Sequence, residues 1–195
     1  MLEGGALESD GCGTLLTTEE CLLSDIQERN PGLTREGYEQ VFKKTLGVSK
    51  VIWLDRSCEG DDTHGHIDDV ARFVHPGKVV LSFEENKKDP NHEFSVENLR
   101  RLKEARDANG KSLEITLLPM PSRLTFDGYR LPASYANFYI ANSVVLVPTF
   151  NDPNDLLVLN TLADLFPTRK IVGIYCGDLI LGFGTLHCLT QQEIA

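Results

Sequence analysis

Residues 60–69 gather most of the side chains that could do chemistry in the first half of the chain. The segment reads Gly-Asp-Asp-Thr-His-Gly-His-Ile-Asp-Asp, with four aspartates and two histidines in ten positions. Buried charges are tolerated only when they are paired or bound, so this composition is not typical of a core. His66 and Asp68 stand two positions apart, a spacing that puts both side chains on one face of an extended backbone. A base and a carboxylate directed into the same space indicate a functional site.

Two interpretations of this segment are open. In the first, His66 is a general acid/base for a cysteine nucleophile, and Asp68 binds a cationic group. In the second, His64, His66 and Asp68 are metal ligands, because the run is similar to the His-x-His-x-Asp-His run of metallo-β-lactamase-type hydrolases. Aspartate replaces histidine at the last position of that run, which weakens the metal interpretation. The remaining acidic residues are expected to be solvated and to cap turns; they are Asp61, Asp62 and Asp69.

A second segment, GFGTLHCLTQQ at residues 182–192, offers a nucleophile. Cys188 follows His187 directly, and Gly184 lies four positions before the cysteine, where it would let a substrate approach the backbone. A cysteine in an apolar strand is usually an inert small side chain. An activated nucleophile and a buried thiol are therefore both open for Cys188.

The third candidate lies at the start of the chain, where Glu3 precedes Gly4 and Gly5. Paired glycines let the backbone pass close to a ligand, and they also form ordinary turns. Beside a Cys/His pair, Glu3 could orient the imidazole or hold a guanidinium through charge-assisted hydrogen bonds. An exposed, frayed terminus is an equally good interpretation of the residue alone.

Composition narrows the class of protein. The 195 residues carry a net charge of -10, which disfavours nucleic acid and anionic membranes as partners and gives a weak preference for a cationic small molecule. Apolar runs such as Ser143–Pro148 have the length of strands and are too short to span a membrane, and the acidic first residues do not have the pattern of a signal peptide. Five scattered cysteines without a Cys-x-x-Cys pair indicate free thiols in a reducing compartment, so we expect a cytoplasmic protein.

The elements that must position these residues alternate between strands and helices. Helical spacing after Thr34 and before Gly47 predicts a first helix. A second helix is expected from about Ser95 to Ala108, with an apolar face formed by Val96, Leu99, Leu102 and Ala105. A third begins at Asp152-Pro153 and ends near Phe166. The expected strands are Thr14–Thr18, Lys50–Leu54, Lys78–Phe83, Leu113–Leu118, Tyr135–Ile140, Ser143–Pro148 and Lys170–Tyr175. Residues 119–132 are expected to form a long, functional loop.

These elements repeat. A helix, a short stop and an apolar strand occur three times, at intervals of roughly 60 residues, and each unit is expected to contain two strands, a helix and a strand. The prediction is an α/β repeat array without a linker, hence one domain over residues 1–195.

Several segments together resemble the agmatine deiminase and bacterial peptidylarginine deiminase family of guanidine-modifying enzymes. They are LEGG, DGCGTLLTTEECLL with RNP, GDDTHGHID, RLPASYANFYIAN, VPTFNDPND and GTLHCLTQQ, in the family's order and across essentially the whole chain. The resemblance implies a pentein-type α/β propeller of five ββαβ modules. About three of the five would be present, because the family's N-terminal modules precede Glu-Gly-Gly.

The resemblance also implies a role for each matching residue. Cys188 would be the nucleophile, His66 the general acid/base, Asp68 a carboxylate that binds the guanidinium, and Glu3 the acid that supports the site. Gly4 and Gly184 would lie where the substrate approaches the backbone. The implied reaction is hydrolysis of agmatine to N-carbamoylputrescine and ammonia, without metal or organic cofactor.

Two features of the sequence depart from the family's pattern. The family's Trp-x-Arg-Asp-x-Gly-Pro motif, which supplies a second substrate-binding carboxylate, is not in this chain. The chain reads GFGTLHC at residues 182–188, with Phe183 and Thr185 as departures from the GGGNIHC of agmatine deiminases. Agmatine, a peptidyl arginine and another guanidine are therefore all open as the substrate. The alternative functions are a catalytically silent or partner-dependent fragment of this family and, as a distant one, a zinc hydrolase. As partners of the chain, we expect a homo-oligomer or a second chain that completes the site.

Overall fold

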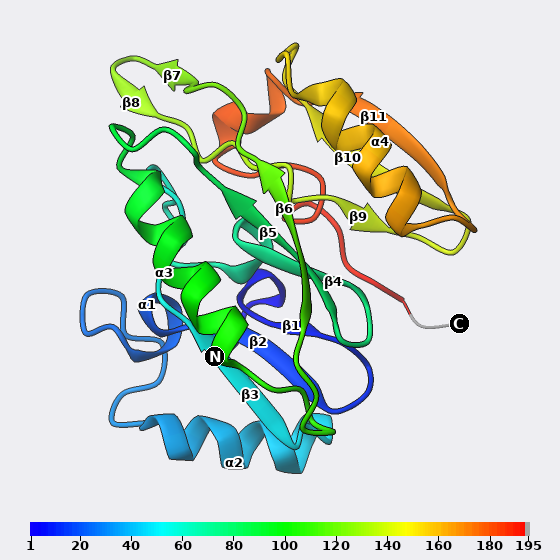
Figure 1. The fold of residues 1–195 in the computed structure, drawn as a ribbon. Helices are drawn as coiled ribbons and strands as arrows, with labels where there is room; N and C mark the ends of the chain where they lie inside the picture. The colour runs from blue at the N-terminus through cyan, green and yellow to red at the C-terminus, as the bar shows by residue number, and fades with distance from the viewer. Residues whose placement is uncertain (194–195) are drawn as a thin grey trace.

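The computed structural model describes residues 1–193 and is built from three small mixed sheets (Figure 1). The first contains β1 (Glu8–Ser9), β2 (Thr14–Thr18) and β3 (Lys50–Leu54). The second contains β4 (Ala71–His75), β5 (Lys78–Phe83) and β6 (Glu114–Pro119), and the third β9 (Tyr139–Ile140), β10 (Val144–Thr149) and β11 (Lys170–Tyr175). In each sheet the first two strands pair antiparallel and the last two pair parallel, so the predicted ββαβ unit occurs three times.

A helix connects the parallel strands of each unit, as a parallel connection requires. These helices are α2 (Arg35–Leu46), α3 (Asn91–Glu104) and α4 (Asp155–Leu165), and Figure 1 shows them at the periphery, at the bottom, left and upper right of the view. The short helix α1 (Glu19–Leu23) precedes α2, and three 3-10 turns complete the helical elements: η1 (Gly4–Ala6), η2 (Ile67–Asp69) and η3 (Leu179–Gly182).

The central strands are buried on both faces, which explains their nearly continuous apolar sequences. Successive side chains of β5 point to opposite faces: Val79 and Leu81 join one hydrophobic cluster, while Val80 joins another. Strand β2 does the same, since Leu15 and Leu16 belong to different clusters. Three contiguous clusters therefore form a layered core between the sheets and their helices.

Several predicted elements are confirmed. The strands at 14–18, 50–54, 78–83 and 170–175 have the predicted bounds. Helix α2 begins after Thr34, whose side chain accepts a hydrogen bond from the Gly37 amide, and ends at Gly47 in the left-handed region. The architecture is mixed α/β, as expected.

Other bounds were wrong. Helix α3 begins at Asn91 and ends at Glu104, not at 95–108, because its buried face carries Asn91, Ser95 and Asn98, which an apolar pattern does not detect. Helix α4 begins at Asp155, because the Asp155 carboxylate accepts hydrogen bonds from the Phe150 and Asp152 amides and leaves 152–154 in a turn.

Two predicted segments near the middle of the chain also differ. Residues 119–132 are not only a loop: β7 (Thr125–Phe126) and β8 (Tyr129–Arg130) form a hairpin around Asp127-Gly128, both with positive φ. Of the strand expected at 135–140, only residues 139–140 are extended in a sheet. Among the described residues, no helix combines the length and the apolar character needed to cross a membrane.

Candidate active site

A cleft of about 430 Å³ brings both ends of the chain together. Its walls come from the start of the chain around η1, from residues 62–68 at η2, and from the segment that follows η3. All six residues predicted from the sequence line it: Glu3, Gly4, His66, Asp68, Gly184 and Cys188. The fold therefore assembles the predicted residues in one place.

The turn before η2 sets the position of His66. The Asp61 carboxylate accepts hydrogen bonds from the amides of Thr63 (2.8 Å), Gly65 (2.9 Å) and His66 (3.2 Å), so the expectation that Asp61 caps a turn is confirmed. Gly65 has φ +102°, and a Cβ there would lie 2.7 Å from the Cys21 amide nitrogen. The backbone at Ile67–Asp69 is a 3-10 turn that follows His66 directly, not the extended strand assumed from the spacing.

Gly5 allows His66 and Asp68 to share the cleft. A Cβ on Gly5 would lie 2.6 Å from His66 Nδ1 and 2.8 Å from Asp68 Oδ2, distances that Cβ atoms do not adopt. A Cβ on Gly4 would meet only Gln191 Oε1, at an ordinary 3.7 Å. Of the two glycines after Glu3, Gly5 is therefore the one whose missing side chain the site requires, and the Gly-Gly pair was its only sequence signal.

Asp68 pairs with His187, a contact that the sequence did not predict. Asp68 Oδ2 accepts a hydrogen bond from His187 Nδ1 at 2.8 Å, and the Cys188 thiol donates to the same oxygen at 3.4 Å. Burial by itself would raise the pKa of Asp68, but the hydrogen bond and charge of His187, together with the charge of Arg72, outweigh burial and hold the pKa below its ordinary value. Asp68 is therefore an ionised carboxylate next to the sulfur.

Asp69 corrects an expectation. It was expected to be solvated, but it is 4% exposed and its Oδ1 accepts a hydrogen bond from Asn137 Nδ2 at 2.9 Å. Burial and the neighbouring carboxylates Asp68 and Asp61 raise the pKa of Asp69 well above its ordinary value. Asn137 itself received no role from the sequence; its contact with Cys188 Sγ at 3.0 Å is visible only in the fold.

Three polar atoms in the cleft are buried and have no hydrogen-bond partner among the described residues: Glu3 Oε2, His66 Nε2 and Asp68 Oδ1. The other Glu3 oxygen accepts from Arg29 Nε at 3.0 Å. Burial would raise the pKa of Glu3, but the Arg29 guanidinium holds it below its ordinary value, so Glu3 is ionised. Unpartnered buried polar atoms are costly, and such a set indicates that a ligand with several donors belongs there.

The Cys188 thiol is not pre-activated. The Cys188 residue is exposed, but desolvation of its sulfur by the surrounding protein, followed by the acidic side chains of Asp69 and Asp68, raises the pKa of the thiol. A hydrogen bond from Asn137 acts in the opposite direction. A thiol beside carboxylates ionises readily only when a cation enters, so the site itself favours a cationic partner for the thiolate.

Two groups of side chains could bind a metal ion. The donor atoms of Glu3, Cys21 and His66 lie within 4.8 Å of one another, as do those of Asp68, Asp69 and Cys188. The set proposed from the His-x-His-x-Asp run is different, because His66 and Asp68 fall into separate groups and His64 into neither. The arrangement on which a zinc hydrolase of that type depends does not form in the described part of the chain.

Comparison with known proteins gives matches over nearly the whole chain. Residues 1–193 match the family described as Porphyromonas-type peptidyl-arginine deiminase. A Latilactobacillus sakei protein, provisionally named an agmatine deiminase, is 43% identical over 98% of this chain and 57% of its own length.

Solved structures agree with these matches. An arginine deiminase, provisionally so named, from Porphyromonas gingivalis matches with a TM-score of 0.93 and 44% identity over 98% of this chain and 56% of that one. Agmatine deiminase of Enterococcus faecalis matches with a TM-score of 0.92 and 38% identity, over 99% and 57%. The chain thus spans a little over half the length of these relatives.

Proposed function

Because this chain belongs to the Porphyromonas-type peptidyl-arginine deiminase family, we propose that it forms the nucleophile-bearing part of a guanidine deiminase that hydrolyses agmatine to N-carbamoylputrescine and ammonia. The observation that carries the proposal is the set of three unpartnered buried atoms on Glu3, His66 and Asp68 in the cleft that Cys188 lines. Two of these side chains are ionised carboxylates, whose oxygens match the N–H groups of a planar guanidinium.

The substrate would also activate the nucleophile. The ionised Asp68 disfavours the Cys188 thiolate in the free cleft, whereas a bound guanidinium places a positive charge beside the sulfur. The thiolate would therefore form mainly when a cationic substrate is present. This arrangement selects for guanidines over neutral amides or esters, because neutral substrates cannot offset the negative charge of Asp68.

The reaction proceeds in two halves. The Cys188 thiolate attacks the guanidinium carbon, and His66 gives a proton to the nitrogen that leaves as ammonia, so that an S-alkylthiouronium remains on Cys188. His66, now neutral, takes a proton from a water molecule whose oxygen adds to the same carbon. The C–S bond then breaks, the sulfur leaves as thiolate, and the remaining hydroxyl proton is lost to solvent as the neutral ureido product is released.

The organisation of the whole protein is part of the proposal. Three ββαβ units correspond to about three of the five modules of a pentein-type propeller, as one domain over residues 1–195. A second copy or a separate chain would supply the remaining walls of the site. A silent fragment is the competing proposal, since the chain covers only 57% of its curated relatives. The five free cysteines support the expectation of a reducing, cytoplasmic compartment.

Ammonia release from agmatine tests the proposal, with Cys188→Ala as the inactive variant and Cys12→Ala, an exposed thiol, as the matched control. We expect release by the wild type and by Cys12→Ala, and none by Cys188→Ala. A 2-haloacetamidine, which carries the same cationic group, should label Cys188 faster than a neutral haloacetamide does. Ammonia release from an arginine peptide but not from agmatine would make a peptidyl arginine the substrate in place of agmatine. A folded sample that neither releases ammonia nor becomes labelled at Cys188 would favour the silent fragment.

A further inference from the structure

Asn137 lies at the centre of the contacts that hold Cys188. It is fully buried, and its side-chain oxygen accepts hydrogen bonds from Thr185 Oγ1 (2.9 Å), the His187 amide (3.0 Å) and the Cys188 amide (3.3 Å). The His187 amide also donates to the Asn137 main-chain carbonyl at 3.1 Å. The segment that carries the nucleophile is therefore fastened to this one residue.

These contacts fix which way the amide faces. Two of the three groups around Oδ1 are main-chain N–H donors, which cannot accept a hydrogen bond, so the atom that faces them must be the oxygen. The amide nitrogen consequently points to the other side, where it donates to Cys188 Sγ at 3.0 Å and to Asp69 Oδ1 at 2.9 Å. An amide donor at this distance stabilises a thiolate more than a thiol.

The backbone around Asn137 is held just as firmly. Arg72 is 2% exposed and donates to the carbonyl oxygens of Phe138 (2.7 Å) and Ala136 (3.2 Å), on either side of Asn137. Its guanidinium is paired in turn with Glu8 at 2.8 Å. Strands β1 and β4 thus fix the segment in which Asn137 lies, and a residue held in this way can orient another one.

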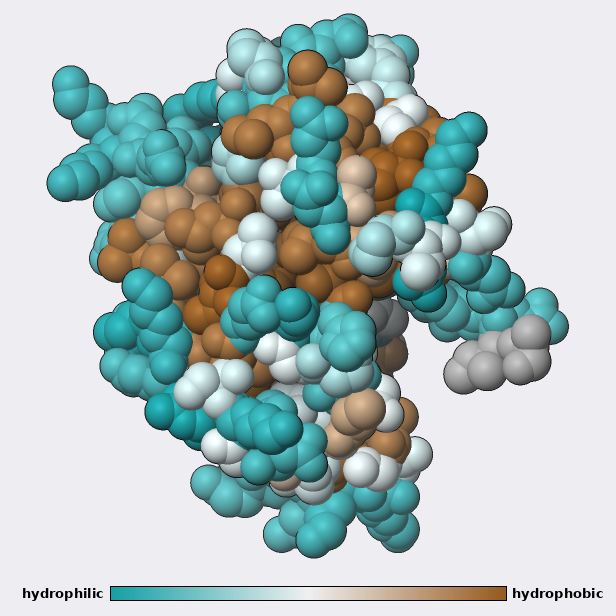
Figure 2. Space-filling model, turned by 45° about the vertical axis from the view of Figure 1, so that its right-hand side comes forward, coloured by the Kyte–Doolittle hydropathy of each residue, from teal (hydrophilic) through white to brown (hydrophobic). Residues whose placement is uncertain are grey.

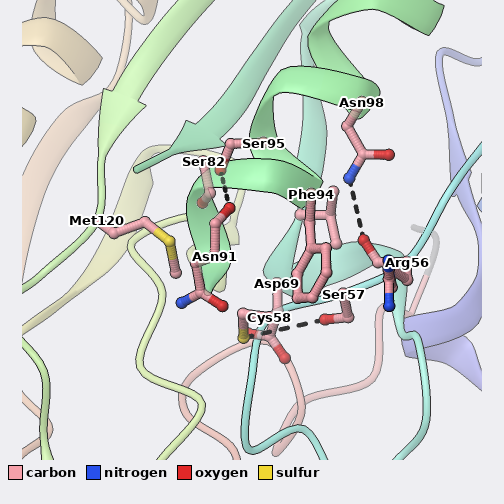
Figure 3. A pocket seen from close by; sticks show the side chains of 11 residues that line it. Arg56, Ser57, Cys58, Asp69, Ser82, Asn91, Phe94, Ser95, Asn98 and Met120 are labelled. Carbon is pink, nitrogen blue, oxygen red and sulfur yellow. Dashed lines mark hydrogen bonds between the residues drawn. The ribbon is translucent and has the colours of Figure 1, made fainter. Parts of the chain in front are cut away.

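Asp69 supports the amide from the other side. Figure 3 shows its side chain at a small cavity, near Cys58 and below Phe94. The cavity has a volume of about 20 Å³, too small for a substrate, and it shares no lining residue with the cleft that contains Cys188. Buried beside two other carboxylates, Asp69 favours its neutral form, in which it accepts from Asn137 without adding a full negative charge near the sulfur.

We propose that Asn137 positions the Cys188 sulfur for attack and donates a hydrogen bond to its thiolate, and that Asp69 is a positioning residue that fixes the Asn137 amide in this orientation. This inference deepens the proposed function and rests on it, because only a deiminase would use the Cys188 thiolate to attack a guanidinium carbon. The contacts with the sulfur do not depend on which guanidine is bound.

Alkylation of Cys188 by iodoacetamide tests this without any substrate. The rate constant is followed by mass spectrometry from pH 6 to pH 10.5, with the exposed Cys12 of the same molecule as internal reference. The ionisable groups that face the thiol are Asp68 and Asp69 from η2 and His187 from its own segment, with Glu3 and His66 across the cleft. None of these is altered in the Asn137 variants.

We expect Asn137→Ala to lower the rate at pH 8 by roughly tenfold and to shift the profile to higher pH, because the thiolate loses its donor. Asn137→Asp should lower it further, since a carboxylate then faces the sulfur. Asn109→Ala, a matched change at an exposed asparagine, should leave the Cys188 rate unchanged. An Asn137→Ala protein that unfolds at the wild-type urea midpoint and keeps the wild-type profile would overturn the proposal.

Asp69 is tested by its conservative variant. Asp69→Asn keeps an acceptor for the Asn137 amide and a neutral side chain, so its Cys188 alkylation rates should stay within about twofold of wild type across the pH range. Asp69→Ala removes the acceptor, and its rates should approach those of Asn137→Ala. A marked acceleration in Asp69→Asn would show an ionised Asp69 and overturn its assigned part. Ammonia release is measured separately. If the alkylation rates of wild type and variants follow the prediction but the wild type releases no ammonia, the deiminase function is rejected and the positioning role of Asn137 is kept.

Discussion

Gly5 is the position where one methyl group should do the most damage to the site. In Gly5→Ala the new Cβ would press on His66 Nδ1 and Asp68 Oδ2, both buried and unable to move away freely. We expect a loss of about 1–3 kcal/mol in the free energy of unfolding, typical of overpacking, and at least tenfold slower labelling of Cys188 by a haloacetamidine. Gly4→Ala, which meets only a flexible glutamine, should stay within about 0.5 kcal/mol of wild type. Equal urea midpoints for the two variants would contradict the steric argument.

The neutral Asp69 should make stability depend on pH. Its folded-state pKa is raised above the unfolded value of about 3.9, so the stability that it contributes is full below that pH and is lost as the pH rises toward the folded pKa. The loss amounts to at most about 1.4 kcal/mol per pH unit. Asp69→Asn cannot ionise, so its advantage over wild type should grow between pH 4.5 and pH 7.5.

Urea unfolding at several pH values measures this difference. Asp164→Asn, at an exposed aspartate of α4, is the matched control, and its difference from wild type should stay constant across the same range. A constant difference for Asp69→Asn as well would mean that Asp69 is ionised in the folded protein already at low pH, contrary to its burial beside Asp68.

Single residues can be selected from the sequence where residue type implies chemistry. His66, Asp68 and Cys188 could be selected because an imidazole, a carboxylate and a thiol are rarely placed without a reason beside glycines. Asn137 and Asp69 could not be selected, because their importance lies in contacts across 51 and 68 positions of the chain. Their residue types are also common in ordinary turns.

At the scale of elements, helix α3 shows how a polar buried face misleads an apolar pattern. Asn98 is 2% exposed; its Oδ1 accepts from the Asp55 amide at 2.7 Å and its Nδ2 donates to the Arg56 carbonyl at 3.0 Å. Figure 3 shows Asn91, Ser95 and Asn98 along the helix beside the cavity. Val96, which the pattern placed on the buried face, is 45% exposed.

A pair of substitutions on α3 tests this assignment of its faces. Asn98→Ala should cost about 1–3 kcal/mol, because it leaves the amide of Asp55 and the carbonyl of Arg56 without their partners. Val96→Ser should change the free energy of unfolding by less than about 0.5 kcal/mol. Guanidinium unfolding followed by circular dichroism distinguishes the two, and a larger loss for Val96→Ser would restore the face predicted from the apolar pattern.

The same elements show which bounds a sequence can fix. Helix α2 was predicted closely because Thr34 and Gly47 are strong local end signals, and their effect does not depend on the rest of the fold. The start of α4 was misplaced because Asp152 and Asp155 are equally good caps by type, and only the tertiary contacts of Asp155 with Phe150 and Tyr135 decide between them.

At the scale of the whole molecule, the candidate site depends on contacts between the two ends of the described chain. Glu3 precedes the first ββαβ unit and Cys188 follows the third, yet both line one cleft, together with Asp68 of η2. This is possible only because the three units pack against one another. The site therefore cannot form in any one unit alone. Its integrity reports on the packing of all three.

The surface of the molecule predicts how the chain behaves alone. Figure 2 shows apolar side chains spread over a broad band of one face. Leu156 and Leu157 on α4 are 68% and 55% exposed, and Tyr175 at the end of the neighbouring strand β11 is 52% exposed. Adjacent exposed apolar groups of this kind mark surfaces that bind another protein, whereas single exposed ones are ordinary. We expect a second copy to cover part of this surface in solution, because these neighbouring apolar side chains are exposed on one element pair.

Sedimentation velocity over a hundredfold range of concentration measures this association. The sedimentation coefficient of the wild type should rise with concentration, and the double substitution Leu156→Glu with Leu157→Glu should abolish the rise, because burying two charges at the contact is costly. Ile26→Glu replaces an apolar side chain that is 80% exposed in the segment between α1 and α2, and this variant should associate like the wild type. A monomer at every concentration would reject a second copy as the partner and leave a separate completing chain. If the wild type alone both associates and releases ammonia in proportion to its dimer fraction, the partner copy contributes to the site.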